Sequence, residues 1–191
     1  MHQAGILHDE FVFQGLSALT NGILRDERVF NMTDANFLSK YNDQGMSHIL
    51  LRMLYSTLLI TSTVIMEATQ YKAWTEAGPD VIIAEAQERL CQNGWDDVRP
   101  ALSTTIRGLI MRAFMENGLR GDPESAVHFY GNALKVLDWG RKEWRGVSKD
   151  DRGAVFEPTF IRGVRSLRIN VLMQVSPVRY MSENELTPMA V

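Results

Sequence analysis

The residue types that most often carry chemistry are few in this chain, and their spacing matches no catalytic or metal-binding motif. Cys91 is the only cysteine, so the sequence excludes an intramolecular disulfide and a zinc site built from several cysteines. The four histidines, His2, His8, His48 and His128, are scattered, and no two stand four residues apart. We therefore expect no metal ion and no cofactor. We interpret His128 as a partly buried helix residue and Cys91 as a bystander.

Acid–base chemistry has one weak candidate, the carboxylates of Glu85 and Glu88 beside Arg89. Residues three apart share a helix face, so the two carboxylates could act together. A solvated helix face explains the same pattern more simply. Phosphate-binding glycine loops and the G-x-S-x-G elbow of hydrolases do not occur in the sequence. The sequence thus gives no catalytic residue and leans against an enzyme.

Basic side chains gather towards the C-terminus, where they could form a surface that binds anions. Residues 141–191 carry nine basic and six acidic side chains, whereas the whole chain has a net charge of −3. Arg162, Arg165 and Arg168 recur every three residues along the expected final helix. The cations just upstream are Arg141, Lys142, Arg145, Lys149 and Arg152. This region could bind an acidic peptide, a phosphate or RNA, or it could be a solvated face paired with nearby carboxylates.

The composition is that of an ordinary globular protein, with 45% hydrophobic and 23% charged residues in 191. This length suits one domain or a short helical array. The longest nearly uncharged apolar stretch, 53–66, is shorter than the roughly 20 residues that cross a bilayer, so we expect a buried helix there and no membrane partner. The N-terminal residues lack the features of a secretory signal. Together with the single cysteine, these features favour an intracellular protein, cytoplasmic or nuclear.

Helix signals recur along the chain, and strand signals are nearly absent. Apolar residues follow the spacing of helix faces, and the pairs Gly78-Pro79 and Asp122-Pro123 mark helix starts. We predict about seven helices, over residues 6–24, 33–41, 48–74, 79–93, 97–118, 123–144 and 158–173, with Asp96 or Asp97 as the cap of the fifth. Short turns make neighbouring helices antiparallel. The prediction is an all-α fold of antiparallel helical hairpins, either a stacked array or an irregular bundle. It forms one domain over 1–173, with a poorly ordered tail over 174–191.

The stretch Gly121–Asp138 resembles the turn and second helix of a tetratricopeptide repeat. That family places a small residue, an aromatic residue and another small residue four and three apart, and Ala126, Tyr130 and Ala133 match this spacing. In the family, the alanines let the two helices of a hairpin approach closely, while the ring fills the groove towards the next hairpin. The resemblance implies stacked helical hairpins and a protein-binding role.

The same resemblance implies a concave binding face on the preceding helix, over residues 103–118. Arg107, Met111, Arg112 and Met115 would point towards that face. Methionine suits adaptable contacts with a peptide, and arginine suits carboxylates.

The sequence therefore predicts a non-catalytic protein–protein interaction module of the tetratricopeptide-like helical-repeat type. Its partner would be another protein or a peptide, with acidic groups that match the arginines. Two alternatives stay open. One is a helical-bundle enzyme or small-ligand binder with a pocket near Thr57 to Thr63. The other is binding of nucleic acid or an acidic partner through the basic final helix, and nucleic acid is less favoured because the overall charge is negative.

Overall fold

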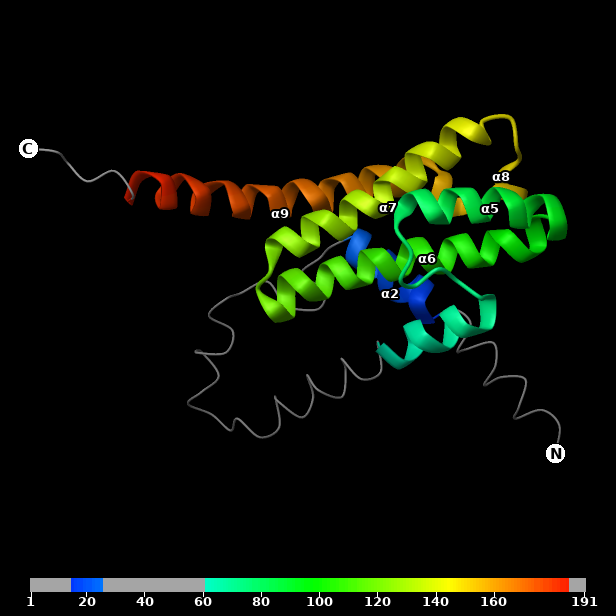
Figure 1. Cartoon of the computed structure of the whole chain (residues 1–191), viewed down its shortest axis with the longest axis horizontal. Coiled ribbons are helices and arrows are strands. Elements are labelled where there is room, and N and C mark those ends of the chain that lie inside the picture. The colour runs from blue at the N-terminus through cyan, green and yellow to red at the C-terminus, as the bar shows by residue number, and fades with distance from the viewer. Residues whose placement is uncertain (1–14, 26–60, 186–191) are drawn as a thin grey trace, which may run out of the picture.

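The computed structural model describes residues 15–25 and 61–185, which consist of helices and the turns that join them, with no strand in these ranges (Figure 1). The all-α fold class predicted from the sequence is confirmed. The expected helix over 33–41 and the first part of the one over 48–74 lie outside the described residues.

The helices vary widely in length. They are α2 (Gly15–Arg25), a helix over 61–71, α5 (Pro79–Asn93), α6 (Trp95–Met115), α7 (Pro123–Glu143), α8 (Lys149–Arg152) and α9 (Pro158–Glu185). A π-helix, Glu116–Arg120, continues α6, and a short 3-10 helix, Ala154–Phe156, precedes α9.

The long helices α5, α6, α7 and α9 lie side by side and alternate in direction along the chain (Figure 1). The central helix α6 packs against α5 and α7 on one side and against α2 on the other. The α9 helix lies along α7 and runs on beyond the end of the bundle. This arrangement is a set of antiparallel hairpins built around α6, and it leaves one side of α6 beside the 61–71 helix.

The helix starts follow local chemistry. Pro79 begins α5 directly after Gly78, and Pro123 begins α7 after Asp122, whose carboxylate accepts the Ser125 N–H at 3.0 Å. Both predicted starts are confirmed. The predicted cap of α6 is wrong, because this helix begins at Trp95 straight after Gly94. Gly94 has φ of 76° and ψ of −175°, a conformation open to glycine, which lets a single residue turn the chain from α5 into α6.

The core lies between α6, α7 and α9 and takes further side chains from α2 and α5. Its largest fully buried side chains include Leu102, Ile106, Ile110, Tyr130, Leu137 and Phe156. Ala126 and Ala133, which carry the tetratricopeptide resemblance with Tyr130, are fully buried at the packing surface of α7. At the end of the bundle near α8, the rings of Trp95, Trp139 and Phe156 surround Trp144 in edge-to-face contacts with centroids 4.7 to 5.3 Å apart.

Three expectations about helix bounds and burial differ from the structure. The helix predicted to reach residue 74 ends at 71, and the final helix continues past Gln174 to Glu185. The apolar stretch 53–66 was expected to be buried, but Ile65 and Met66 are 58% and 55% exposed. Neither side chain belongs to the core, and Ile65 instead lines an open groove beside α6. Within residues 15–25 and 61–185, no helix combines the length and apolar character that a membrane crossing requires.

Candidate functional site

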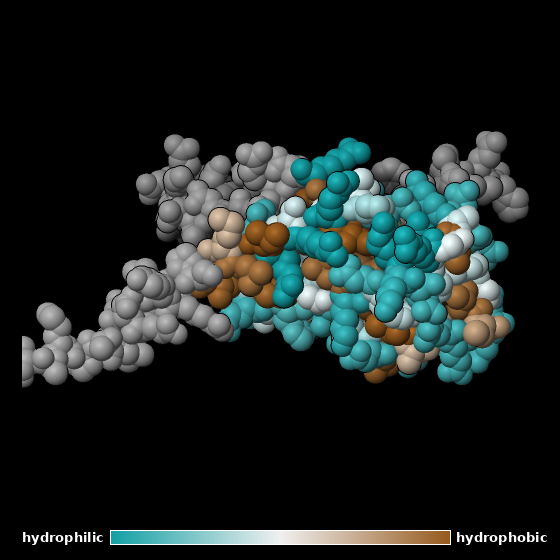
Figure 2. Space-filling view, turned by 90° about the horizontal axis from the view of Figure 1, so that it is seen from above, coloured by the Kyte–Doolittle hydropathy of each residue, from teal (hydrophilic) through white to brown (hydrophobic). Residues whose placement is uncertain are grey.

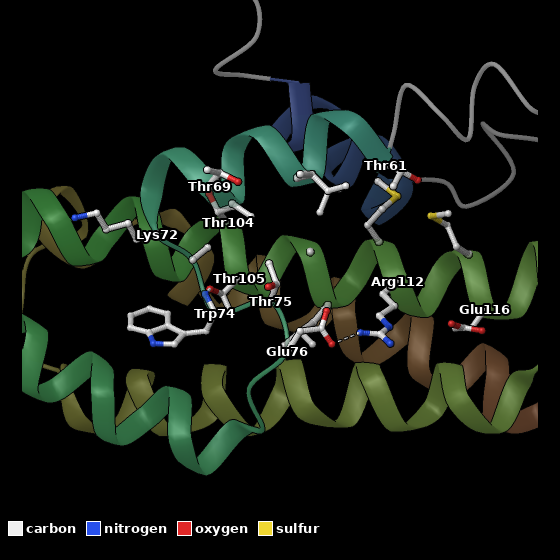
Figure 3. Close-up of a pocket in the computed structure, with 18 of the residues that line it drawn as sticks. Thr61, Thr69, Lys72, Trp74, Thr75, Glu76, Thr104, Thr105, Arg112 and Glu116 are labelled. Carbon is white, nitrogen blue, oxygen red and sulfur yellow. Dashed lines mark hydrogen bonds and ion pairs between the residues drawn. The ribbon is translucent and has the colours of Figure 1, made fainter.

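A groove of about 690 Å³ lies between the 61–71 helix, the linker that follows it and α6 (Figure 3). This size falls within the roughly 300 to 1,000 Å³ of small-molecule sites. Its apolar lining comes from both helices and consists mainly of Val64, Ile65, Ala68, Leu109, Met111 and Met115. The groove follows α6 from the level of Thr104 to that of Glu116, a rise of about 18 Å at 1.5 Å per residue.

The 61–71 helix ends in a Schellman motif that directs the linker across the groove. The Lys72 N–H donates to the Thr69 carbonyl at 3.3 Å, and the Ala73 N–H donates to the Ala68 carbonyl at 2.8 Å. Lys72 has φ of 50° and is the one described non-glycine residue with a positive φ. Glycine usually occupies this position because a Cβ is strained there. The motif thus holds a lysine, with some strain, at one end of the groove (Figure 3).

The linker is fixed by the contacts of Trp74. Its backbone N–H donates to the Thr105 hydroxyl at 3.0 Å, and that hydroxyl donates in turn to the Ala101 carbonyl at 2.8 Å. Its indole Nε1–H donates to the Glu85 carboxylate at 2.6 Å, and the Arg89 guanidinium lies 5.4 Å from the ring centroid. Trp74 is therefore a positioned wall of the groove, held from both α5 and α6.

Arg89 joins three segments at this wall. Its guanidinium donates to the Tyr71 and Lys72 carbonyls, which end the 61–71 helix, and to the Asp97 carboxylate of α6 at 2.8 Å. The hydrogen bonds from Arg89 hold the pKa of Asp97 well below its usual value. Glu85 is exposed and Glu88 is exposed, as expected for a solvated helix face, whereas Arg89 is half-buried and the solvated-face expectation is wrong for that residue. Glu85 and Arg89 contact Trp74, which lines the groove. Glu88 does lie on the surface, where it accepts from Gln92 at 3.0 Å.

The floor of the groove consists of methionine side chains and an open space above Gly108. Met111 is buried and Met115 is half-buried, and both line the groove with Leu109. At Gly108 an added Cβ would meet only a Val64 methyl, at 3.9 Å. The floor therefore has room at Gly108, and its methionines can adapt to the shape of an occupant.

The far end of the groove is charged. Arg112 pairs with Glu76 of the linker at 3.6 Å, and its guanidinium lies 4.4 Å from the ring centroid of Phe129 (Figure 3). Beyond it, Glu116 accepts from Arg120 at 3.0 Å. These last two residues begin and end the π-helix, a rare element that often marks functional sites.

Met111, Arg112 and Met115, which the sequence places on a binding face, all line the groove. Arg107 does not, and the expectation that it reaches an open surface is wrong. Its side chain points towards α2, where it donates to the Thr20 hydroxyl and to the Asn21 side chain at 3.0 Å.

Arg107 belongs instead to a buried clamp that holds α2 on the bundle. Glu67 of the 61–71 helix accepts the N–H of Leu16, in the first turn of α2, at 2.9 Å. Burial lowers the pKa of Arg107 to about 10, and burial raises the pKa of Glu67. The two side chains therefore hold α2 against the bundle.

The three C-terminal arginines do not form one site. Arg165 pairs with Asp138 of α7 at 2.7 Å, and Arg162 is exposed on α9. Arg168 is half-buried against Gly131, and its Nε atom is buried without a hydrogen-bond partner. A three-residue spacing turns each arginine further around the helix, and this rotation separates them.

The described residues hold no cluster of three or more histidine, cysteine or acidic side chains able to bind a metal ion. His128 was expected to be partly buried, but it is exposed and lies 3.1 Å from the Asn132 amide. Cys91 is exposed on α5. In the Thr57 to Thr63 segment proposed as a pocket wall, residues 57–60 lie outside the described residues, and Thr61 lines the groove.

Sequence reasoning did not predict that Trp74 lines the groove or that Glu85 and Arg89 hold it there. One signal was available: Glu85 and Arg89 are four apart and share a helix face, so both can reach a side chain laid across that face. The sequence did not indicate that the preceding helix ends at residue 71. Because of that end, Trp74 lies in the linker and not in the helix.

In comparisons with known proteins, the chain matches no family model, no curated protein and no solved structure. The tetratricopeptide resemblance of Gly121–Asp138 stays a prediction.

Proposed function

We propose that this chain is a non-catalytic protein-interaction module, and that the groove along α6 receives a short linear segment of a partner protein. The observation that carries the proposal is the groove itself, with an apolar methionine floor and a rim of cations. Tetratricopeptide-like packing of the α6–α7 hairpin belongs to the same proposal, and its support is the complete burial of Ala126 and Ala133.

The apolar part of the groove favours a protein segment as its occupant. Ile65 lines the groove and is 58% exposed, and the neighbouring Met66 is 55% exposed, so the apolar lining continues onto the outer surface. Apolar surface that is contiguous and rimmed by polar residues is typical of interaction sites. A floor of about 18 Å fits five or six residues of extended chain, at roughly 3.3 Å each. Two apolar anchor side chains of such a segment would cover Met111 and Met115.

The charged part of the groove favours an acidic flank on that segment. Among the described residues of the lining, Glu76 and Glu116 are each already paired with an arginine. Lys72 lies at the opposite end with no carboxylate within 4 Å among the residues described. Arg120 is 74% exposed despite its pair with Glu116, so it can also reach a carboxylate of a partner. The preferred segment therefore has apolar anchors and at least one acidic residue.

A reducing intracellular compartment, cytoplasmic or nuclear, is part of the proposal. Its support is Cys91, a single cysteine whose thiol is exposed.

Selection from a library of random linear peptides displayed on phage tests this function. We expect the full chain to enrich peptides with two apolar residues and a nearby Asp or Glu. The Gly108→Leu variant places a side chain in the open part of the floor and should lose these peptides, whereas Gly131→Ala on α7, outside the groove, should keep them. Peptides that bind the wild type and Gly108→Leu equally would contradict the proposal.

A small-molecule ligand is the second candidate, because two threonines lie at the floor. Thr104 and Thr105 are only 5% and 3% exposed. The Thr105 hydroxyl already binds the linker and the Ala101 carbonyl, so Thr104 is the buried hydroxyl that can orient a ligand. Thermal denaturation against a metabolite library would support this candidate if one compound raised the melting temperature of the wild type and left Gly108→Leu unchanged.

A further inference from the structure

We propose that a hollow at the C-terminal end of α7 binds the dianion of a phosphate monoester. The hollow measures about 500 Å³ and is lined by Asp138, Arg141, Lys142, Arg145 and Arg152. It shares no lining residue with the groove along α6, so it is a second, separate site.

The last turn of α7 and the turn after it supply three of the basic residues. Arg141 and Lys142 follow Asp138 by three and four residues, so these three side chains share a face of α7, and Arg145 lies in the turn directly after the helix ends at Glu143. Arg152, from the short helix α8, completes the hollow from the opposite side. The turn of the chain from α7 into α8 therefore brings together four cations that lie within twelve positions of the sequence.

Two of these cations are held in place by one carbonyl group. Arg141 donates to the Phe156 carbonyl at 3.2 Å, and Arg152 donates to the same oxygen at 3.1 Å. Phe156 is itself fully buried against Trp144, with ring centroids 5.3 Å apart. The two guanidinium groups are thus positioned by the core and are close to each other before any ligand arrives.

The charges of the hollow do not balance. Glu157 neutralises Arg152 at 2.7 Å, and Asp138 is neutralised by Arg165 of α9 at 2.7 Å. Arg141, Lys142 and Arg145 have no carboxylate within 4 Å among the described residues. Three like charges around one small hollow repel each other, and a multivalent anion would relieve that repulsion.

A phosphate monoester fits this arrangement better than a nucleic acid does. It carries about −1.5 to −2 charges at neutral pH and three acceptor oxygens on one phosphorus atom. The forked donors of two arginines and the mobile ammonium of a lysine suit such a compact group. A nucleic acid presents single charges spaced along a strand, and its binding would call for a longer track of cations than this hollow provides.

Two sources of the ligand are possible in chemical terms, a small phosphorylated compound and a phosphorylated residue of a partner protein. Titration with inorganic phosphate, with a peptide containing one phosphoserine and with the same peptide containing serine distinguishes them. The signals to follow are the arginine side-chain Nε–H resonances of the ¹⁵N-labelled chain at pH 7.5. A phosphopeptide that binds more tightly than inorganic phosphate identifies a protein partner, and the reverse identifies a small compound.

Side-chain variants give the decisive comparison. Lys142 and Arg145 are exposed and make no hydrogen bond in the described structure, so a double Lys142→Ala, Arg145→Ala variant should fold normally. We expect it to bind phosphate ligands at least about ten-fold more weakly, because two charge-assisted contacts are lost. The control is Lys135→Ala, which removes a lysine of α7 that pairs with Asp80 outside the hollow.

The proposal predicts saturable shifts of Arg141 and Arg152 in the wild type and in the control. Shifts that grow linearly with ligand concentration, or that sodium chloride reproduces, would overturn it. Binding that weakens as much in Lys135→Ala as in the double Lys142→Ala, Arg145→Ala variant would also overturn it. Tighter binding of a single-stranded RNA oligonucleotide than of either phosphate monoester would overturn it as well. Loss of groove binding in Gly108→Leu leaves these outcomes unaffected, so the two sites are tested separately.

Discussion

Replacement of Gly108 by alanine should stabilise the protein, although this residue lies in the middle of its central helix. Glycine inside a helix costs about 0.8 to 1.0 kcal/mol relative to alanine, because the backbone of glycine loses more freedom on folding. The new methyl group would meet one atom within 4 Å, the Val64 Cγ1 at 3.9 Å, which is an ordinary contact distance. We therefore expect the free energy of unfolding to rise by about 1 kcal/mol.

For a chain of 191 residues, that gain corresponds to a rise of about 2 to 4 °C in melting temperature. The assay is thermal and urea denaturation followed by circular dichroism. Gly131→Ala on α7 is the matched control, because its added Cβ would lie 3.9 Å from the Arg168 side chain and should give a similar gain. Both glycines are half-buried and inside long helices.

Comparing the two variants separates the higher helix propensity of alanine from the effect of the space beside Gly108. If the 61–71 helix packed directly on Gly108, the extra methyl would force the two helices apart and cost about 1 to 3 kcal/mol. A Gly108→Ala variant less stable than the wild type, with Gly131→Ala stabilised, would therefore refute the open floor on which the groove depends.

Three further results are expected. Gly140→Ala should lower the free energy of unfolding by about 1 to 3 kcal/mol, since the added Cβ would overlap the buried ring of Phe156; urea denaturation checks this. Lys72→Gly should raise the free energy of unfolding by about 1 kcal/mol in the same assay, because glycine relieves the strain at φ of 50°. Burial raises the pKa of Glu67 above its usual 4.5, so the stability that this group contributes is full below that pH and is lost as pH rises through the folded-state pKa. Denaturation from pH 4 to 8 should show the wild type losing stability relative to Glu67→Gln as the pH rises.

The starts of α5 and α7 were predictable because they depend on neighbouring residues alone, whereas the start of α6 after Gly94 was not predicted. Asp122 and Pro123 specify a cap and a first turn whatever surrounds them, and the carboxylate does accept the Ser125 N–H. Helix ends were less predictable. The 61–71 helix stops at a lysine in the left-handed region, a position where glycine would have been the signal. Two backbone hydrogen bonds and the contacts of Arg89 with the Tyr71 and Lys72 carbonyls stabilise that end.

The candidate site was predicted in part, for a similar reason. The spacing of Met111, Arg112 and Met115 on α6 places all three beside the groove. Arg107 lies one helical turn before Met111, and its side chain turns away from the groove to bind Thr20 and Asn21 of α2. Those two residues are more than eighty positions away in the sequence. The hollow at the end of α7 also depends on a long-range event, the return of the chain at Phe156 onto Arg141. Contacts of this range leave no periodic signal in a sequence.

The most direct test of the proposed function is methyl NMR of the chain labelled at its methionine ¹³Cε groups, titrated with the best peptide from the display selection. Met111 and Met115 line the groove, whereas Met173 is 68% exposed on α9 and lies outside it. The proposal predicts saturable shifts of Met111 and Met115, no shift of Met173, and loss of all shifts in Gly108→Leu. Saturable binding that leaves Met111 and Met115 unchanged would show that the groove along α6 is not the binding site.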